Sequence, residues 1–277
     1  MFDEASFTLA KQQSPQILEM VGHTVHNMLD LACGPGRHLL GFAQFGINVT
    51  GVDLSGYLLS QAANHFDQHK ELHETTGTLV HCDMLAYEPK QKFDLITNLF
   101  TSFGYYPTAE ENQQLLNNAY QWLNKGGSLV IDTFGKEQVA HMMEPVHLTE
   151  YDNGDLRIER PMLIDDMSVF ANEWILVRGD EVFRREYQHF VYSAIEMKAM
   201  LKQAGFEDIR IYGSFEGDDY DLDEIVWAKV SGFPWWPAFV SSKSANSKYE
   251  VIFLSDLTRS ILSQDKIRHF NETPSSL

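Results

Sequence analysis

The chain has 277 residues, enough for one large domain or for one domain and a small module. Its charge is uneven: 15 basic against 34 acidic side chains in residues 1–223, a net −19, and 6 against 5 in residues 224–277, a net +1. An acidic body repels a nucleic-acid backbone, which argues against DNA or RNA as its direct partner.

Two sequence features bear on location. The chain begins without a basic, apolar leader and has no apolar run near ~18 residues, so we expect it to be neither secreted nor membrane-spanning. Cys33 and Cys82 are the two cysteines, which excludes a disulfide framework and favours a reducing compartment. The expected location is intracellular and cytoplasmic, or nuclear if the tail described below is functional.

The first predicted elements are a strand, a tight loop and a helix. Residues 28–31 are apolar around Asp30, and a loop of small residues that includes Gly34 and Gly36 follows. A second apolar run closes with Asp53, which lies 17 positions (53 minus 36) after Gly36. This order predicts the cofactor edge of an open α/β sheet, with the second acid placed to hold a ribose diol.

The glycine spacing indicates which cofactor is bound. The third glycine of a dinucleotide-binding loop would fall at Leu39, so the loop is poorly suited to a pyrophosphate. Asp30 would repel a phosphate, whereas it suits the ammonium group of an amino acid. The pattern therefore favours S-adenosylmethionine over a nicotinamide or flavin cofactor.

The following elements continue the alternation of helices and strands. Helices are predicted at 37–45, 56–68 and 110–123, and further strands at 78–82, 93–98 and 128–132. This order predicts a doubly wound, Rossmann-like, mostly parallel sheet. Histidines recur every four residues in the second helix and its extension, at His65, His69 and His73; we interpret them as a solvated helix face and predict no metal site.

With these residues in place, the chain resembles the class I S-adenosylmethionine-dependent methyltransferases over about its first 215 to 230 residues. The resemblance implies that the first loop holds the methionine part, the second acid holds the ribose, and an acid after the third strand meets the adenine. The implied cofactor residues are Asp30, Ala32, Gly34, Gly36, Asp53, Leu54, Asp83, Met84 and Asn98. Ala32 stands where the family usually has its first glycine.

Residues 136–192 break the alternation with β-leaning segments at 146–151, 156–164, 168–177 and 181–192. Asn153-Gly154 and Gly179-Asp180 between them suit tight hairpins. We interpret the region as a small antiparallel insertion over the mouth of the site; in similar methyltransferases that act on small molecules, such an insertion often forms the acceptor pocket. A helix at 195–203 and a strand at 208–214 are then predicted to complete the domain.

Residues 101–106, Thr-Ser-Phe-Gly-Tyr-Tyr, directly follow the fourth strand, where ligands of such sheets bind. They resemble a motif of a group of bacterial-type methyltransferases. Two interpretations stay open: the aromatic rings shield the sulfonium, or they pack under the insertion. Tyr105, Tyr106 and Arg185 are the candidate acceptor contacts, and no general base is assigned because methyl displacement needs mainly alignment and desolvation.

The tail carries a second motif. Residues 223–238 contain Pro234-Trp235-Trp236-Pro237, and together with the strand-like residues 249–256 they resemble a PWWP domain. The resemblance implies an aromatic cage for methylated lysine of histones, formed here by Phe233, Trp236 and Phe253 with Asp256 nearby. The alternative is a small barrel that folds without binding such a peptide.

The two resemblances compete for residues 224–230. That segment stands where a methyltransferase sheet has its last strand, and it is also the first strand of the PWWP barrel. We predict a methyltransferase domain at 1–222 and a PWWP-like module at 223–277, which is incomplete if residues 224–230 belong to the methyltransferase sheet. The predicted function is methyl transfer to a small-molecule or protein acceptor; the alternative is a chromatin-binding protein with a non-catalytic methyltransferase scaffold.

Overall fold

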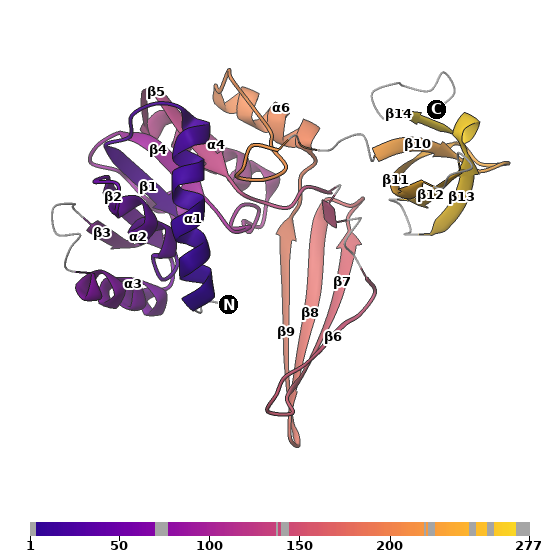
Figure 1. Cartoon of the computed structure of the whole chain (residues 1–277), viewed down its shortest axis with the longest axis horizontal. Helices are drawn as coiled ribbons and strands as arrows, with labels where there is room; N and C mark the ends of the chain where they lie inside the picture. Colours follow the sequence, from indigo (N-terminus) through magenta and orange to yellow (C-terminus); the bar gives the residue numbers. More distant parts are fainter. Residues whose placement is uncertain are drawn as a thin grey trace. The chain divides into compact units, whose positions relative to one another are not determined.

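The fold is described from a computed structural model of the chain, shown in Figure 1. The described residues are 4–69, 77–136, 138–139, 144–218, 220, 225–243, 248–253 and 258–269. They fall into two compact units, one of residues 1–133 and 197–219 and the other of residues 134–196 and 220–277.

The first unit is built on a five-stranded parallel sheet with the order β3-β2-β1-β4-β5. The strand order reverses between β1 and β4, and open α/β sheets bind ligands at the carboxyl ends of the strands on either side of such a reversal. The predicted Rossmann-like fold is therefore confirmed. Its strands are β1 (Asn27–Leu31), β2 (Asn48–Asp53), β3 (Gly77–His81), β4 (Phe93–Asn98) and β5 (Leu123–Ile131).

The predicted helices of this unit lie close to their expected limits, and α1 and the short helix η2 are additions. The helices are α1 (Glu4–Val21), α2 (Arg37–Ala43), α3 (Gly56–Gln68), the short 3₁₀ helix η2 (Met84–Ala86), α4 (Ala109–Trp122) and α6 (Ala194–Ala204), which reaches into the second unit. Helix α1 was not predicted. It packs closely on α2 at Gly41, where a Cβ atom would lie 2.2 Å from the Ser14 hydroxyl oxygen.

The core of the first unit forms where α1 and α2 meet the sheet. Ile17 of α1, Phe42 of α2 and Met28 and Leu95 of the central strands are fully buried in one cluster. The central strands are apolar over nearly their whole length because helices cover the sheet. Their one buried acid, Asp30, is therefore an exception that calls for a functional explanation.

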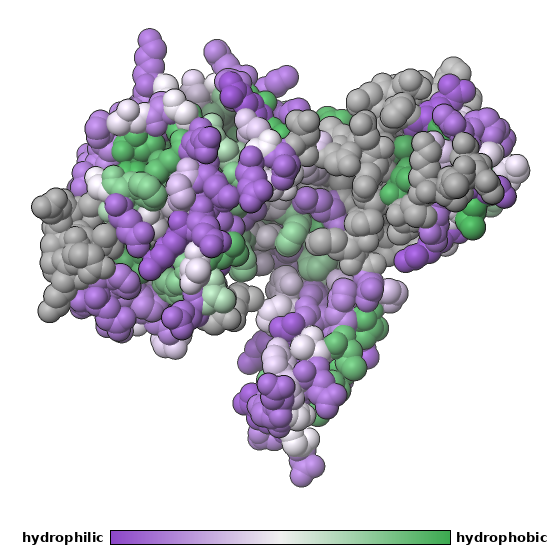
Figure 2. Space-filling model, in the orientation of Figure 1, coloured by the Kyte–Doolittle hydropathy of each residue, from purple (hydrophilic) through white to green (hydrophobic). Residues whose placement is uncertain are grey.

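The insertion forms a separate four-stranded antiparallel sheet in the second unit, as predicted. Its strands, in spatial order, are β6 (His147–Glu150), β7 (Leu156–Ile164), β8 (Val169–Arg178) and β9 (Glu181–Phe190). Gly154 and Gly179 adopt positive φ in the two predicted hairpin turns. Figure 2 shows apolar side chains along the β6–β7 side of this sheet, where Leu148 and Met162 are exposed.

The C-terminal strands form a small five-stranded antiparallel sheet with the order β13-β12-β11-β10-β14. They are β10 (Ile225–Lys229), β11 (Trp235–Lys243), β12 (Lys248–Phe253), β13 (Arg259–Ser263) and β14 (Ile267–His269), with the 3₁₀ helix η3 (Gln264–Lys266) before the last. Strand β10 pairs with β11 and β14. The contested segment thus belongs to the small β module.

One predicted strand is not formed. Residues 208–214 are irregular, and Tyr212 alone makes a β-bridge. The neighbouring side chains and main chain favour a turn instead: Asp208 pairs with Arg210, and the Gly213 amide donates to the Asp218 carbonyl at 2.8 Å. None of the helices in the described part of the chain is both long and apolar enough to cross a membrane.

Candidate functional site

The loop after β1 is the centre of the candidate site, and its backbone adopts unusual conformations. Ala32, Gly34 and Gly36 have φ values of 60°, 55° and 77°. Gly36 is the N-cap residue of α2, and a Cβ atom there would lie 3.0 Å from the Ala62 Cβ. Gly51 on β2 lies under the loop, where a Cβ would come within 2.7 Å of the Cys33 sulfur. The small residues therefore bring the main chain close to the end of the sheet.

Asp30 lies at the end of β1 with 2% of its surface exposed. The Thr97 hydroxyl on β4 donates to its carboxylate at 2.7 Å. The pKa of Asp30 is raised to about 7, chiefly by burial and to a smaller extent by the charge of Asp53, while the Thr97 hydrogen bond and the charge of Arg37 limit the rise. Ionising this buried carboxyl group is unfavourable, and a cationic ligand group beside it would stabilise the ionised form. Asp30 is therefore suited to bind such a group.

Asp53 ends β2 and holds the loop through its carboxylate. The Gly34 amide donates to one oxygen at 2.8 Å, and the Ser55 amide donates to the other at 2.7 Å. The side chain is 8% exposed. Each carboxylate oxygen still has a second lone pair, so the group can accept hydroxyl donors from a ligand while it keeps the loop in place.

Asp83 follows β3 and is joined to the segment after β4. It caps η2 by accepting from the Leu85 amide at 2.8 Å, and the Tyr106 hydroxyl donates to the same oxygen at 2.5 Å. Burial raises the pKa of Tyr106 above its usual value, and the bond to Asp83 adds to this effect. Tyr106, predicted as an acceptor contact, thus positions the third acid.

Asn98 ends β4 next to the loop after β1. Its side-chain amide nitrogen donates to the Leu31 carbonyl at 2.9 Å and lies 3.7 Å from the Met84 sulfur. The side chain is 1% exposed, and its oxygen has no hydrogen-bond partner among the described residues. A buried acceptor without a donor is costly, so this atom fits a ligand that brings an N–H, O–H or cationic group.

Arg37 is the first residue of α2 and is 5% exposed. Its guanidinium lies over the Phe100 ring, 4.0 Å from the ring centre. Asp132, directly after β5, accepts from the Phe100 amide at 2.9 Å through its side chain. Burial lowers the pKa of Arg37, and the charges of Asp30 and Asp132 oppose that shift.

The remaining predicted residues of the first unit lie further out. Leu54 is 71% exposed beside Asp53, and Tyr105 is half exposed after the buried Phe103. Arg185 lies on β9 in the second unit, where its guanidinium donates to the Arg184 carbonyl. His65 contacts the ring of Phe7 and the Pro35 carbonyl, and His73 lies outside the described residues.

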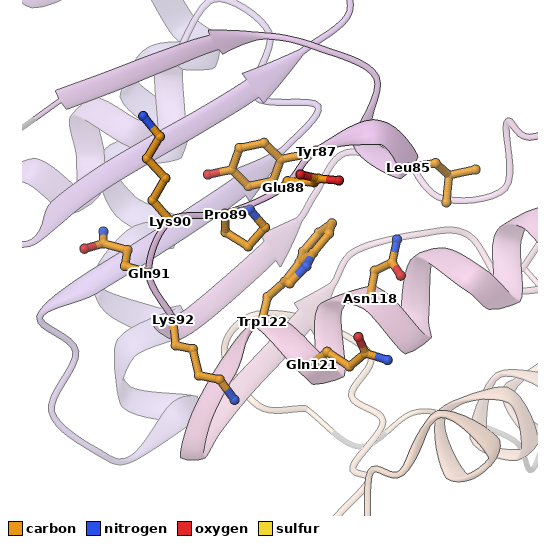
Figure 3. A pocket seen from close by; sticks show the side chains of 10 residues that line it. All are labelled: Leu85, Tyr87, Glu88, Pro89, Lys90, Gln91, Lys92, Asn118, Gln121 and Trp122. Atoms are coloured by element: carbon orange, nitrogen blue, oxygen red, sulfur yellow. The ribbon is translucent and has the colours of Figure 1, made fainter.

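The described residues contain no group of three or more His, Cys, Asp or Glu side chains arranged to hold a metal. A hollow of about 500 Å³ lies between the loop after η2 and the end of α4 (Figure 3). Tyr87, Lys90 and Trp122 line it, and the rings of Tyr87 and Trp122 meet edge to face. Leu85 also lines the hollow, and the loop after β1 contributes none of the lining residues.

The small β module carries the second group of predicted residues. Trp236 is 38% exposed and Phe233, in the turn before it, is 62% exposed, whereas Phe253 is buried in the core of the module. Ala238 pairs with Phe253, so Trp236, two residues earlier, lies on the same face of the sheet as Phe253. Asp256 lies outside the described residues.

Sequence reasoning missed three residues of the candidate site: Thr97, Arg37 and Asp132. Asp132 had a usable signal, because it ends a predicted parallel strand just as Asp53 does. Thr97 and Arg37 had none, since a threonine within a strand and an arginine opening a helix are ordinary residues. Their roles depend on the pairing of β1 with β4.

The parallel sheet, the glycine loop and the acids at its carboxyl edge define a class I S-adenosylmethionine-dependent methyltransferase. Comparison with known proteins agrees: residues 28–127 match the sequence profile of the methyltransferase domain, and residues 223–276 match that of the PWWP domain. The protein is therefore an S-adenosylmethionine-dependent methyltransferase that also carries a PWWP domain.

Two curated relatives each match more than two thirds of the chain. A protein of Geobacillus sp. (strain WCH70) that is named as a methyltransferase is 27% identical over 194 residues, which are 68% of this chain and 76% of that protein. The glycine/sarcosine N-methyltransferase of Aphanothece halophytica is 24% identical over 209 residues, 73% of this chain and 74% of the relative.

Solved structures share the fold. An S-adenosylmethionine-dependent methyltransferase from Clostridium acetobutylicum has a TM-score of 0.66 at 20% identity, covering 76% of this chain and 87% of its own. The amino pentose methyltransferase CalS10 from Micromonospora echinaspora, solved with bound S-adenosylmethionine, has a TM-score of 0.59 at 20% identity, covering 76% and 88%. At these identities the likeness concerns the fold.

Proposed function

We propose that the chain transfers a methyl group from S-adenosylmethionine to a small-molecule or protein acceptor by direct displacement. The observation that carries this proposal is the group of three carboxylates, Asp30, Asp53 and Asp83, that follow or end neighbouring strands beside a loop of small residues. The cofactor supplies an electrophilic methyl group on a positively charged sulfur. The residues of the chain bind, orient and shield it.

Each carboxylate suits a different part of the ligand. Asp30 accepts from the ammonium group, because it is buried and has one bonded neighbour in Thr97. Asp53 accepts from the ribose hydroxyls with the lone pairs left beside its two amide bonds. Asp83 meets the adenine. The supporting contacts are assigned to Ala32, Gly34, Gly36, Leu54, Met84 and Asn98.

The acceptor side of the site needs few groups of the chain. Displacement from a sulfonium needs in-line alignment and exclusion of water, so a general base is not required. Tyr105 is half exposed at the carboxyl edge of the sheet and is the acceptor contact we favour in this unit. Arg185, on the insertion sheet, is the second candidate.

Two relatives guide the choice of acceptors to screen. One is named for methylation of glycine and sarcosine. The other, 31% identical over 106 residues, is a dTDP-3-amino-sugar N,N-dimethyltransferase of Streptomyces venezuelae. Both names point to amine nitrogens of small molecules. We propose that primary and secondary amines be screened first with a labelled methyl donor, ahead of protein side chains.

Calorimetry tests the cofactor site. The wild type should bind S-adenosylmethionine. Asp53→Ala should weaken binding about 100-fold or more, because it removes the carboxylate that accepts hydrogen bonds from the loop amides and from the ligand hydroxyls. Asp208→Ala is the matched control, since Asp208 is an exposed acid of the same unit that pairs with Arg210. Equal affinities for wild type and Asp53→Ala would refute the assignment.

We further propose that residues 223–277 form a module that binds trimethylated lysine in a peptide. Support comes from the half-exposed Trp236 and the buried Phe253 on one face of the sheet, with Phe233 exposed in the adjoining turn. Ring faces attract a quaternary ammonium group. We place the boundary between the two domains near residue 222, because β10 is paired inside the small module.

A pull-down with trimethyl-lysine histone peptides tests this second function. The 277-residue chain should be retained, and Trp236→Ala should lose retention, while an unmethylated peptide serves as the ligand control. Ile261→Ala is the matched protein control, because Ile261 is an exposed apolar residue of the same module. Equal retention of wild type and Trp236→Ala would show that Trp236 does not take part in binding the peptide.

A further inference from the structure

One face of the insertion sheet carries polar and aromatic side chains to which the proposed methyl transfer gives no role. They come from β7, β8 and β9, which lie side by side (Figure 1). Glu159 on β7 lies opposite Trp174 on β8. Asn172, also on β8, lies opposite Tyr187 on β9. Residues that are directly opposite, or two apart along a strand, point to the same face of a sheet. We call this side the polar face; it carries Glu159, Asn172, Trp174 and Tyr187.

The polar face is not an ordinary solvated face. Ala171 and Ile175 of β8 point to the opposite face and are 6% and 4% exposed, so the opposite face is the apolar one. An antiparallel sheet with one apolar face normally turns its other face to water. Asn172 on the polar face nevertheless has only 5% of its surface exposed. The rings of Trp174 and Tyr187 meet edge to face there, with 5.6 Å between their centres.

Asn172 and Trp174 each bring a buried polar atom that no hydrogen bond satisfies. The Asn172 amide nitrogen donates to a Glu159 carboxylate oxygen and to the Tyr187 hydroxyl, each at 3.3 Å. Its oxygen accepts from none of the described residues, and the indole N–H of Trp174 finds no acceptor among them. A buried polar atom without a partner is costly. The two atoms together fit a ligand that offers both a donor and an acceptor.

Arg157 of β7 lies over this part of the polar face. Its guanidinium is 5.7 Å from the centre of the Trp174 ring, and its Nε lies 2.9 Å from a Glu159 carboxylate oxygen. The Arg157 side chain is 35% exposed and that of Glu159 is 18% exposed. A long, partly exposed side chain moves aside easily, so a ligand reaches the buried atoms by displacing the guanidinium. Arg157 and Glu159 then present charged donors and acceptors to the ligand.

We propose that the polar face binds a sugar-class ligand, a six-membered ring with several hydroxyl groups, at Asn172, Trp174 and Glu159. Each hydroxyl both donates and accepts, which is what the oxygen of Asn172 and the indole N–H require. The carboxylate of Glu159 accepts from neighbouring hydroxyls, and the C–H groups of a sugar ring pack on the indole ring. This binding site does not depend on the proposed methyl transfer. Arg185, directly opposite Trp174, lies on the same face.

Calorimetry on the 277-residue chain tests the site with the methyl glycosides of glucose, galactose, mannose and glucosamine. At least one of them should bind saturably. Cyclohexanol, which keeps a six-membered ring and one hydroxyl, should bind at least about tenfold more weakly than that glycoside. The proposal is overturned if none of the four glycosides binds or if cyclohexanol binds equally well. Tighter binding of N-acetylalanine methylamide than of every glycoside would assign the face to peptides and also overturn it.

Variants then assign the binding to the polar face. Trp174→Phe keeps an aromatic ring and removes the indole N–H, so it should weaken the glycoside about five- to tenfold. Asn172→Leu keeps a similar size and removes the amide, so it should weaken the glycoside at least about tenfold. Both variants should bind S-adenosylmethionine as the wild type does, which separates this site from the cofactor site. Trp122→Phe is the control, because Trp122 lines the hollow of the first unit.

A purely structural role for the cluster gives a different result. Replacing a buried, unsatisfied amide with an apolar side chain would then preserve or raise the unfolding temperature and leave glycoside affinity unchanged. Unchanged affinity in Trp174→Phe overturns the proposal, whether or not Asn172→Leu folds. A loss of glycoside affinity in Trp122→Phe equal to that in Trp174→Phe would place the sugar elsewhere and overturn it as well.

Discussion

The substitution Asp30→Asn separates what stabilises the protein from what lets it bind its cofactor. Asp30 has its pKa raised to about 7 from an ordinary 3.8, chiefly by burial. A carboxyl group whose pKa is raised in the folded protein does not oppose folding at pH values below its unfolded pKa. Above that pH the cost of ionising the buried group grows, and it levels off once the pH passes the folded pKa. The window is therefore pH 3.8 to 7, and at pH 8 the ionised group costs about 4 kcal/mol.

Asparagine keeps the oxygen that accepts from Thr97 and removes the charge. The NH2 group of the asparagine side chain loses the water that solvates it in the unfolded chain, which costs about 1–3 kcal/mol. The pH dependence is the cleaner quantity, because that cost does not change with pH. The stability of the variant relative to wild type should rise by roughly 2.5 kcal/mol between pH 5 and pH 8.

The assay is urea-induced unfolding of the cofactor-free wild type and variant at both pH values. A relative stability that stays constant with pH would refute the conclusion that burial of Asp30 opposes its ionisation. Calorimetry measures the effect on cofactor binding: the variant should lose affinity for S-adenosylmethionine at pH 8. The wild type should bind about 30-fold more weakly at pH 5.5 than at pH 8, because a protonated Asp30 cannot pair with an ammonium group.

The other predictions concern the loop and the third acid. Gly51→Ala should lower the free energy of unfolding by about 1–3 kcal/mol, because the new methyl would lie 2.5 Å from a Leu39 carbon; urea unfolding with no loss would contradict this packing. Ala32→Gly should raise it by about 0.5–1 kcal/mol, since φ there is 60°; thermal unfolding checks the sign. Tyr106→Phe should weaken binding of 5′-methylthioadenosine about tenfold by calorimetry, because Asp83, which we assign to the adenine, loses a hydrogen-bond donor; unchanged affinity would contradict that assignment.

The limits of four strands of the parallel sheet were predictable because the helices on it bury those strands, whereas β5 begins at Leu123, five residues before its predicted start at 128. Buried parallel strands read as short apolar runs, and the ligand edge adds an acid or amide at their ends, as at Asp53 and Asn98. The hairpins of the insertion were equally readable, because Asn-Gly and Gly-Asp supply the positive φ that tight turns need. Local chemistry determined both patterns.

What the sequence did not yield depends on contacts between distant segments. Tyr106 lies in a loop without periodicity, and its bond to Asp83 arises because the segment after β4 returns past the end of β3. Residues 208–214 alternate as a strand would, yet the pairing of Asp208 with Arg210 and the turn at Gly213 stabilise an irregular path. Helix α1 has a broken apolar pattern with Pro15 inside it, so its packing on α2 was not visible beforehand.

The two proposed sites bind cations by different physical means. A primary ammonium group has N–H donors, so a buried carboxylate such as Asp30 holds it well. A trimethylated ammonium has no donor, and ring faces such as that of Trp236 are the better receptor. S-adenosylmethionine should therefore not displace a trimethyl-lysine peptide from the PWWP domain at concentrations that fill the methyltransferase site. Competitive elution would show that the cage recognises positive charge in general rather than the methylated ammonium group.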